Sequence, residues 1–394
     1  MPIQSRSLII GTVIVFILII LGIIVGVGVG NQGVSITSPF VEGGPLSSFK
    51  NTSAKDINDS ISTEDDLASF ADNLQSGGPP PDGIPPIDDP KYVLVSRVDF
   101  LSDDEKVFIV DQNDEVKIYP QHILVWHEIV NDTFGGEELS VTYCPLTGSL
   151  IGYNTHFDVE ESRTETNFGT SGKLVNSNLV MYDRATDSLW PQILGMGITG
   201  EGRGSELETF PTAWTDWKRA KAEYPDALVL TEETGFFRRY GTDPYGSYEN
   251  ESSYYNEGKP FFPLMNDDDR LNPKEIVLGI KVGKERSAIL KQLIVDEKVV
   301  ETVVGERRIL GVHDEKLDTI WAFDATEISH NIAWEEGEIV DERGIRWSVE
   351  GAELLSSKGE VIPWITSFDV MWFAWAAYYP ATDLIHERKR GFSF

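Results

Sequence analysis

The most prominent hydrophobic pattern is an uncharged apolar run from Leu8 to Val29, long enough to cross a hydrocarbon core of about 30 Å as a helix. Arg6 is the only basic residue before the run, and acidic residues follow from Glu42 onward. This distribution places the N-terminus inside and the rest of the chain outside. A cleaved signal peptide is the alternative, but its apolar core is usually shorter and ends in a small-residue cleavage motif. We therefore expect a single-pass membrane protein, anchored by residues 1–30, whose soluble region lies outside the cytoplasm.

The next segment, residues 31–91, has few positions that could build a core. Gly, Ser, Pro, Asn and Asp dominate it, and it contains the turn-rich stretch Gly77 to Gly83. Such composition predicts a flexible acidic linker. A short helix within Glu64 to Leu74 is compatible with the pattern.

From Val93 onward, short alternating apolar runs are separated by Asp, Asn and Gly, which predicts β-strands joined by hairpins. The segment from Pro120 to Asn131 predicts a helix instead, with proline in its first turn. A strand, an Asp…Trp segment, a Trp-x-x-Trp motif and a Tyr-Pro pair then occur in the same order twice. In the first occurrence the Asp…Trp segment is Asp183 to Trp190 and the Trp-x-x-Trp motif is Trp214 to Trp217. In the second occurrence they are Asp341 to Trp347 and Trp372 to Trp375.

This recurrence predicts an α+β, β-rich fold: two diverged copies of a β-module with short helices, preceded by one transmembrane helix and a disordered linker. The copies would span residues 92–240 and 273–394, joined by a polar connection over 241–272. Chance recurrence in a Trp-rich chain is the alternative. Each Trp-x-x-Trp pair has helical spacing, which is more typical of a core than of a cofactor site.

Charge and cysteine content narrow the possible partners. The net charge of -31 repels nucleic acid and anionic lipid surfaces, so neither is an expected partner of the soluble part. Cys144 is the only cysteine, so no intramolecular disulfide can form.

The sequence around Cys144 is the best candidate for chemistry. The pattern predicts a strand that runs into a turn at Cys144-Pro145-Leu146-Thr147-Gly148, where the Thr147 hydroxyl could reach the sulfur and lower its pKa. His127, just upstream, could act as general base or ion-pair partner of the thiolate. A buried structural cysteine and a helix-surface histidine are the alternatives.

A second group of polar residues could bind a ligand. The segment from Asn176 to Trp190 predicts a hairpin with a turn at Arg184 to Asp187. Asp and Ser in such turns more often bond their own backbone, which is the alternative for this group. The candidate ligand-binding residues are Asn178, Asp183, Arg184, Ser188 and Trp190.

Together, the Cys-Pro-Leu-Thr-Gly block at Cys144 and the Asp-Arg-x-Thr-x-Ser-x-Trp block at Asp183 resemble the family called domain of unknown function 3179. The resemblance spans roughly residues 93 to 390 and implies no settled activity or substrate. It also implies that some relatives carry selenocysteine at the position of Cys144, which favours redox chemistry there.

Three functional hypotheses follow. The first is an extracytoplasmic thiol-based redox protein without a cofactor or metal, in which Cys144 acts with Thr147 and His127 and an external thiol resolves any disulfide. The second is a ligand- or partner-binding module without chemistry. The third is a copper-type thiolate site formed by Cys144, His127 and possibly Met181.

Overall fold

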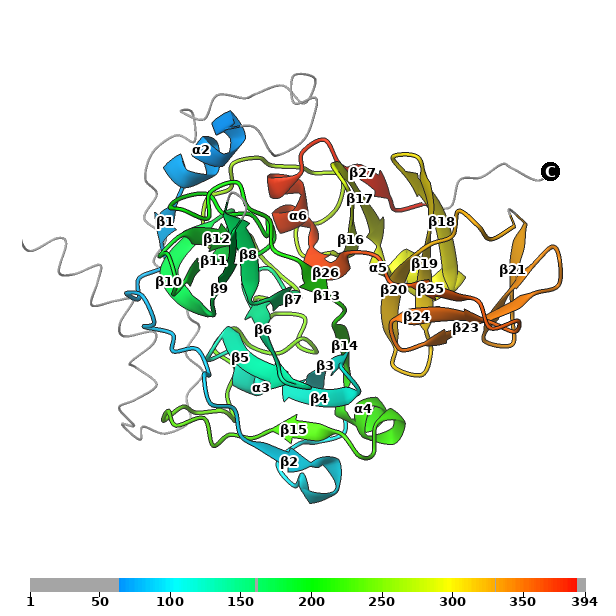
Figure 1. Ribbon diagram of the computed structural model, residues 1–394, viewed down its shortest axis with the longest axis horizontal. Helices are drawn as coiled ribbons and strands as arrows, with labels where there is room; N and C mark the ends of the chain where they lie inside the picture. The colour runs from blue at the N-terminus through cyan, green and yellow to red at the C-terminus, as the bar shows by residue number, and fades with distance from the viewer. Residues whose placement is uncertain (1–63, 160–161, 330, 388–394) are drawn as a thin grey trace, which may run out of the picture. The chain divides into compact units, whose positions relative to one another are not determined.

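Figure 1 shows the computed structural model, which describes residues 64–159, 162–329 and 331–387. Strands dominate this part of the chain, and its helices are short, which confirms the expected β-rich α+β character. The helices are α2 (Glu64–Asp72), α3 (Gln121–Leu124), α4 (Trp217–Glu223), α5 (Lys291–Glu297), α6 (Trp372–Tyr378) and the 3-10 helix η1 (Val95–Arg97).

The expected fold class also contained a transmembrane helix, and this part of the expectation is wrong for the described residues. None of their helices is long and apolar enough to cross a bilayer. The longer ones have seven to nine residues, whereas a crossing takes about 20. The apolar run from Leu8 to Val29 lies outside the described residues, and the location outside the cytoplasm stays a prediction.

The first β-unit combines an open sheet with a meander. The sheet has the order β14-β3-β4-β15-β2, in which β15 runs parallel to β4 and the other pairs are antiparallel. The meander β5-β6-β7 follows α3, and β13 extends it beside β7. The bounds are β2 (Tyr92–Leu94), β3 (Lys106–Gln112), β4 (Glu115–Pro120), β5 (Ile129–Phe134), β6 (Glu137–Cys144), β7 (Ser149–Asn154), β13 (Thr209–Phe210), β14 (Ala213–Asp216) and β15 (Leu228–Leu230).

The second β-unit repeats this arrangement. Its open sheet has the order β26-β16-β17-β27, again with one parallel pair between β17 and β27, and its meander is β18-β19-β20. The bounds are β16 (Ile276–Val282), β17 (Glu285–Leu290), β18 (Val299–Val304), β19 (Arg307–Asp314), β20 (Thr319–Asp324), β26 (Ser367–Met371) and β27 (Asp383–Ile385).

The two units agree in strand register, residue for residue. Val107 pairs with Pro120 in the first hairpin of one unit, and Val277 pairs with Leu290 in the other. A left-handed residue precedes each meander, Glu128 with φ 60° and Lys298 with φ 67°. Both units share this positive φ, which lets the chain leave a helix and enter a strand within one residue.

Each unit also contains additional hairpins between its meander and its last strand. In the first unit these form the β8-β9 hairpin and the strands β10-β11-β12, which β1 from the preceding segment extends beside β10; in the second they form β21-β22-β23-β24-β25. The bounds are β1 (Gln75–Ser76), β8 (His156–Val159), β9 (Ser162–Glu165), β10 (Phe168–Val175), β11 (Asn178–Asp183), β12 (Leu189–Pro191), β21 (Ile332–Glu335), β22 (Glu338–Asp341), β23 (Arg346–Glu350), β24 (Glu353–Ser356) and β25 (Val361–Pro363).

Part of the expected flexible linker is ordered. Residues from Glu64 to 91 include α2 and β1, and Leu67 and Phe70 of the amphipathic helix are buried in a core cluster to which both β-units contribute. Ile87 is also fully buried. Backbone hydrogen bonds also tie the segment to the fold, because the Ile87 N–H donates to the Ile129 carbonyl at 2.9 Å and the Gly77 N–H donates to the Gly172 carbonyl at 2.8 Å. The expected boundaries at 92, 241 and 273 stay predictions.

The helix expected from Pro120 to Asn131 is much shorter than the sequence indicates. It spans only α3, and β5 already begins at Ile129. The positive φ of Glu128 ends the helical path, and Asn131 instead lies in a strand. The apolar residues that suggested one buried helix therefore belong first to the short helix α3 and then to the strand β5.

Candidate functional site

Cys144 occupies the last position of β6, where the chain turns into β7. It pairs with Ser149 across the hairpin, and the Thr147 N–H donates to the Cys144 carbonyl at 3.2 Å. Gly148 closes the turn with φ +59°, a conformation that glycine adopts without steric cost. The turn predicted from Pro145 and Gly148 is thus present, and it places Cys144 at a strand end.

The sulfur of Cys144 is fully enclosed and accepts a hydrogen bond from the backbone. Its side chain has 0% exposure, and the Leu179 N–H donates to Sγ at 3.4 Å. Burial raises the pKa of the thiol to about 11, and the nearby Glu128 carboxyl acts in the same direction. Hydrogen bonds from the Thr147 hydroxyl, the Leu179 N–H and the Thr147 N–H oppose that rise. The resting group is therefore a neutral thiol in a site equipped with donors for a thiolate.

A network of buried polar side chains extends from this turn. Asn178 Nδ2 donates to Thr147 Oγ1 at 3.1 Å and to Gln192 Oε1 at 2.9 Å. Ser149 Oγ donates to the same Gln192 oxygen at 2.7 Å, and Gln192 Nε2 donates to the Thr142 carbonyl at 3.1 Å. All five side chains have 0% exposure. A buried polar network whose members all have hydrogen-bond partners is rigid, because any movement would leave a polar group without a partner. The network therefore fixes the positions of the groups around the sulfur.

Two ionisable residues, Glu128 and Lys274, interact electrostatically with Cys144, and burial shifts the pKa of each toward pH 7. Burial raises the pKa of Glu128 to about 8. Burial lowers the pKa of Lys274 to about 7, with an opposing electrostatic effect from Cys144. Three titratable groups with displaced pKa values in one region are typical of a functional site.

A tyrosine-rich segment without helix or strand covers the turn. We call residues 245–255 the tyrosine cover. Tyr254 donates to the Leu146 carbonyl at 2.8 Å, and the hydroxyls of Tyr248 and Tyr143 lie 2.8 Å apart. Tyr248 also stacks on Tyr255 with ring centroids 3.8 Å apart. The cover belongs to the predicted polar connection, and its aromatic rings close the site that the first unit forms.

His127 is buried elsewhere, and both of its ring nitrogens already have partners. Nδ1 lies 2.7 Å from the Pro85 carbonyl, and Nε2 lies 2.7 Å from the Tyr240 hydroxyl. Burial lowers the pKa of this imidazole to about 4, so the ring is neutral at physiological pH. The structure thus brings Cys144 and Thr147 together and gives His127 a different set of contacts.

Among the candidate ligand-binding residues, only Asn178 joins the network at Cys144. Asp183 instead organises its own turn: its carboxylate accepts the Thr186 N–H at 2.6 Å, the Ser188 N–H at 3.0 Å and the Trp190 Nε1–H at 3.0 Å. Arg184 forms an ion pair with Asp88 at 2.9 Å. In the turn between β11 and β12, the polar side chains therefore bond their own backbone and neighbours, as the alternative to ligand binding predicts.

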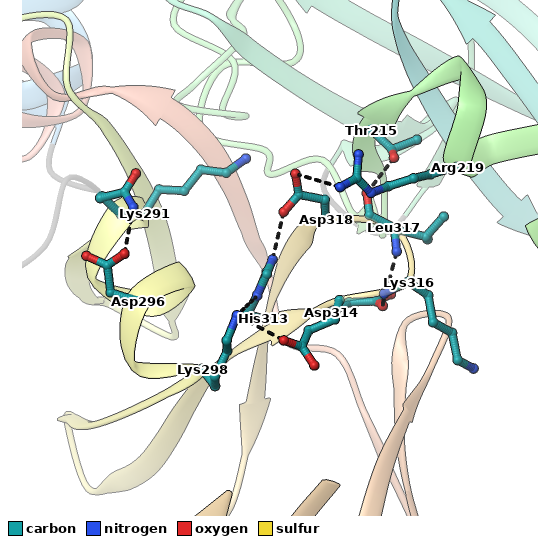
Figure 2. Close-up of polar contacts among 12 residues, drawn as sticks. Thr215, Arg219, Lys291, Asp296, Lys298, His313, Asp314, Lys316, Leu317 and Asp318 are labelled. Carbon is teal, nitrogen blue, oxygen red and sulfur yellow. Dashed lines mark hydrogen bonds and ion pairs between the residues drawn. The ribbon is translucent and has the colours of Figure 1, made fainter. Parts of the chain in front are cut away.

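The equivalent turn of the second unit carries no thiol (Figure 2). Asp314 pairs with Thr319 there, as Cys144 pairs with Ser149, and its carboxylate accepts the Lys316 N–H at 2.9 Å. His313 holds the place of Tyr143, one residue before the counterpart of Cys144. Because neighbouring strand residues face opposite sides, His313 cannot replace the thiol. It binds Asp318 instead, with Nε2 and Oδ1 2.9 Å apart.

Within the part of the chain that the structure describes, the expected copper ligand His127 contacts Pro85 and Tyr240 instead of joining Cys144. The described residues contain no group of three or more His, Cys, Asp and Glu side chains that could hold a metal ion. The residues that sequence reasoning missed are Glu128, Ser149, Gln192, Tyr254 and Lys274. Ser149 could have been predicted from the sequence as the strand partner of Cys144. No local pattern marks Gln192 or Lys274, which reach the site through tertiary folding.

A family model described as "Protein of unknown function (DUF3179)" matches residues 81–382 of the sequence. The chain belongs to the DUF3179 family. The match covers the first β-unit from β2 to β15, the second from β16 to α6, the Cys144 turn and the tyrosine cover, and it confirms the resemblance recognised in the sequence. No curated protein and no solved structure matches the chain.

Proposed function

We propose that this DUF3179 protein carries out thiol-dependent redox chemistry at Cys144, inside a closed polar site. The observation that carries the proposal is the Leu179 N–H, which donates to Sγ at 3.4 Å, while hydrogen bonds from Leu179 and Thr147 lower the pKa of the thiol against the effect of burial. Donors aimed at sulfur favour the thiolate, which is the nucleophile in thiol chemistry. Together with the tightly bonded network of Thr147, Asn178 and Gln192, they hold the nucleophile in a single orientation.

The reaction we propose begins with a hydroperoxide as oxidant. The thiolate attacks one oxygen of the hydroperoxide, an S–O bond forms as the O–O bond breaks, and the departing alkoxide or hydroxide takes up the proton lost by the thiol to leave as an alcohol or as water. The sulfenic acid then reacts with an external thiol, forming a mixed disulfide and water. A second external thiol displaces Cys144 and releases a disulfide. External thiols are necessary because the chain contains no second cysteine.

Trapping of the sulfenic acid tests this function. The full chain and the same chain unfolded in urea are exposed to dilute hydrogen peroxide with a sulfenic-acid trap, and mass spectrometry follows adduct formation at Cys144. We expect faster formation in the folded protein because the donors at Thr147 and Leu179 assemble only on folding. Equal or slower formation in the folded protein contradicts the proposal.

A second candidate function is a binding module without chemistry. The complete burial of Cys144 and the engagement of both His127 nitrogens elsewhere favour it. On this hypothesis the folded thiol gives no sulfenic acid, and Cys144→Ser leaves the melting temperature nearly unchanged, because a serine oxygen can accept the Leu179 N–H in place of sulfur. Peroxide trapping in the native state separates the two functions.

A further inference from the structure

The first strand of each meander lies at the edge of its sheet, and the edge in the first unit is covered by another part of the chain. There, β5 ends the strand order, and its outer side bonds to an extended stretch of the N-terminal segment. The Ile87 N–H donates to the Ile129 carbonyl at 2.9 Å, and the Asn131 N–H donates to the Ile87 carbonyl at 2.9 Å. Ile87 forms a parallel bridge with Val130, and its side chain is fully buried. The first unit therefore shows how an extended segment completes this edge.

The equivalent edge of the second unit, β18, is open in the part of the chain that the structure describes. Strand register makes Val299 the counterpart of Ile129 and Glu301 the counterpart of Asn131. The Val299 carbonyl and the Glu301 N–H point away from β19, and neither has a hydrogen-bond partner among the described residues. Val303, which also lies on this strand, is 59% exposed. An open strand edge with exposed apolar side chains is a template for pairing with another strand.

A pocket of about 280 Å³ lies along this edge. The apolar side chains of Val299, Ile332 and Trp334 line it, together with the carboxylates of Glu297 and Glu301. Ile332 and Trp334 belong to β21, which is an edge strand of the neighbouring sheet. Because side chains of a strand alternate between its two faces, a strand added to β18 would direct some of its side chains into this pocket.

We propose that β18 binds an extended segment of a partner protein as an additional parallel strand, with an apolar residue opposite Val300 and a basic residue next in sequence. The apolar residue takes the place that Ile87 has beside Val130 in the first unit. The basic residue takes the place of Asp88, whose carboxylate accepts a hydrogen bond from Asn131 Nδ2 at 2.6 Å. In this mode of recognition, main-chain hydrogen bonds supply affinity, and the side chains along the edge supply specificity.

Charge complementarity sets the sign of that second residue. Glu301 stands where the first unit has Asn131, so its carboxylate repels an aspartate at the position of Asp88 and attracts a lysine or arginine. Arg308 Nη2 donates to Glu301 at 2.6 Å, yet the Glu301 side chain keeps 41% exposure. Glu297 in the same pocket and the net charge of -31 act in the same direction. The edge therefore favours a basic segment.

Peptide binding tests this surface. The probe is a fluorescein-labelled peptide with the sequence of residues 83–89 of this chain carrying Asp88→Lys and Asp89→Lys, and fluorescence anisotropy follows its binding to the full chain. We expect it to bind, and we expect the acidic parent peptide to bind about tenfold more weakly or worse. Glu301→Lys should reverse this preference, whereas Glu353→Lys on the exposed face of β24 makes the same charge change elsewhere and should preserve it. Absence of binding by the basic peptide, or a preference that Glu301→Lys leaves unchanged, overturns the proposal.

Hydrogen exchange of single amides locates the binding site without any variant. In the free chain the Glu301 N–H should exchange rapidly, whereas the Asn131 N–H should be protected by its bond to Ile87. Saturation with the basic peptide should slow exchange at Glu301 by about tenfold or more and leave Asn131 unchanged. A Glu301 amide that is already protected in the free chain would mean that another part of this chain or a second copy occupies the edge. That result, or peptide binding without protection of Glu301, contradicts docking of a separate partner at β18.

Discussion

Replacing Glu128 with glutamine should make the folded protein more stable, and the gain should grow with pH. The Glu128 side chain is 6% exposed, and burial alone raises the pKa of its carboxyl from 4.5 to about 8. In the unfolded chain the carboxyl releases its proton near pH 4.5, whereas the folded state retains the proton up to about pH 8. Between these values the folded state binds more protons, so the stability of the wild type falls as pH rises.

The displacement of this pKa sets the size of the effect. One pKa unit corresponds to about 1.4 kcal/mol, so the wild type loses roughly 3 kcal/mol by pH 7 and roughly 5 kcal/mol above pH 8 through this residue. Glu128→Gln has nearly the same shape and no proton to lose. The variant should therefore match the wild type below pH 4.5, up to a constant offset, and exceed it increasingly at higher pH.

Urea unfolding at several pH values between 4 and 9 measures this difference directly. Glu138→Gln on the exposed part of β6 is the matched control and should show no such trend. Because the Glu128 charge also raises the pKa of Cys144, Glu128→Gln should make the thiol ionise at lower pH. A stability difference that stays constant with pH, or a wild type that gains on the variant as pH rises, refutes the reasoning.

Three further predictions concern packing and protonation. Gln192→Leu should lower the unfolding free energy by about 3 to 5 kcal/mol in urea titrations, because buried polar partners lose their bonds, while Gln292→Leu on the exposed face of α5 should change it by less than about 0.5 kcal/mol. Gly279→Ala should cost about 1 to 3 kcal/mol, since a Cβ there lies 2.4 Å from a ring carbon of α6, whereas Gly241→Ala has open space and should be near neutral in the same assay. The His127 imidazole should titrate in NMR spectra near pH 4 and should destabilise the fold as pH falls from 6.5 toward 4; an ordinary midpoint near 6.5 would contradict its burial.

The sequence was sufficient where structure depends on a few neighbouring residues. The turn at Cys144 follows from Pro145 and Gly148, and the hairpin turn at Asp183 follows from the ability of Asp to bond its own backbone. Both features involve contacts within a few residues along the chain. Local composition therefore predicted them correctly.

Features that depend on topology were not accessible in the same way. Lys274 lies against the ring of Tyr254, and the Tyr254 hydroxyl bonds the Leu146 carbonyl in the Cys144 turn, although more than 100 residues separate Tyr254 from that turn and no local pattern encodes either contact. The base was assigned to His127 because it is near in sequence, whereas Tyr240 and Pro85 engage that ring. Proximity along a chain is a weak guide once long segments separate the residues that meet.

The repeat shows how similar motifs can mislead about register. The repeated motif in the sequence aligned Trp214 with Trp372. Ile109 and Gly279 are equivalent positions of the two units, and strand pairing places Ala213 opposite Ile109 and Phe368 opposite Gly279, so Ala213 corresponds to Phe368. Trp217, which begins α4, is therefore the counterpart of Trp372, which begins α6. Only hydrogen-bond register distinguishes these two alignments.

The enclosure of Cys144 depends on residues synthesised long after it. The Met371 N–H donates to the Thr147 carbonyl at 2.9 Å, and Tyr378 of α6 packs in the same core as Cys144. While the chain is still emerging from the ribosome, the thiol lacks these neighbours and is open to alkylation or oxidation. Protection of the sulfur therefore marks the completion of synthesis, and a chain truncated before α6 should expose its only cysteine to the first reagent that it meets.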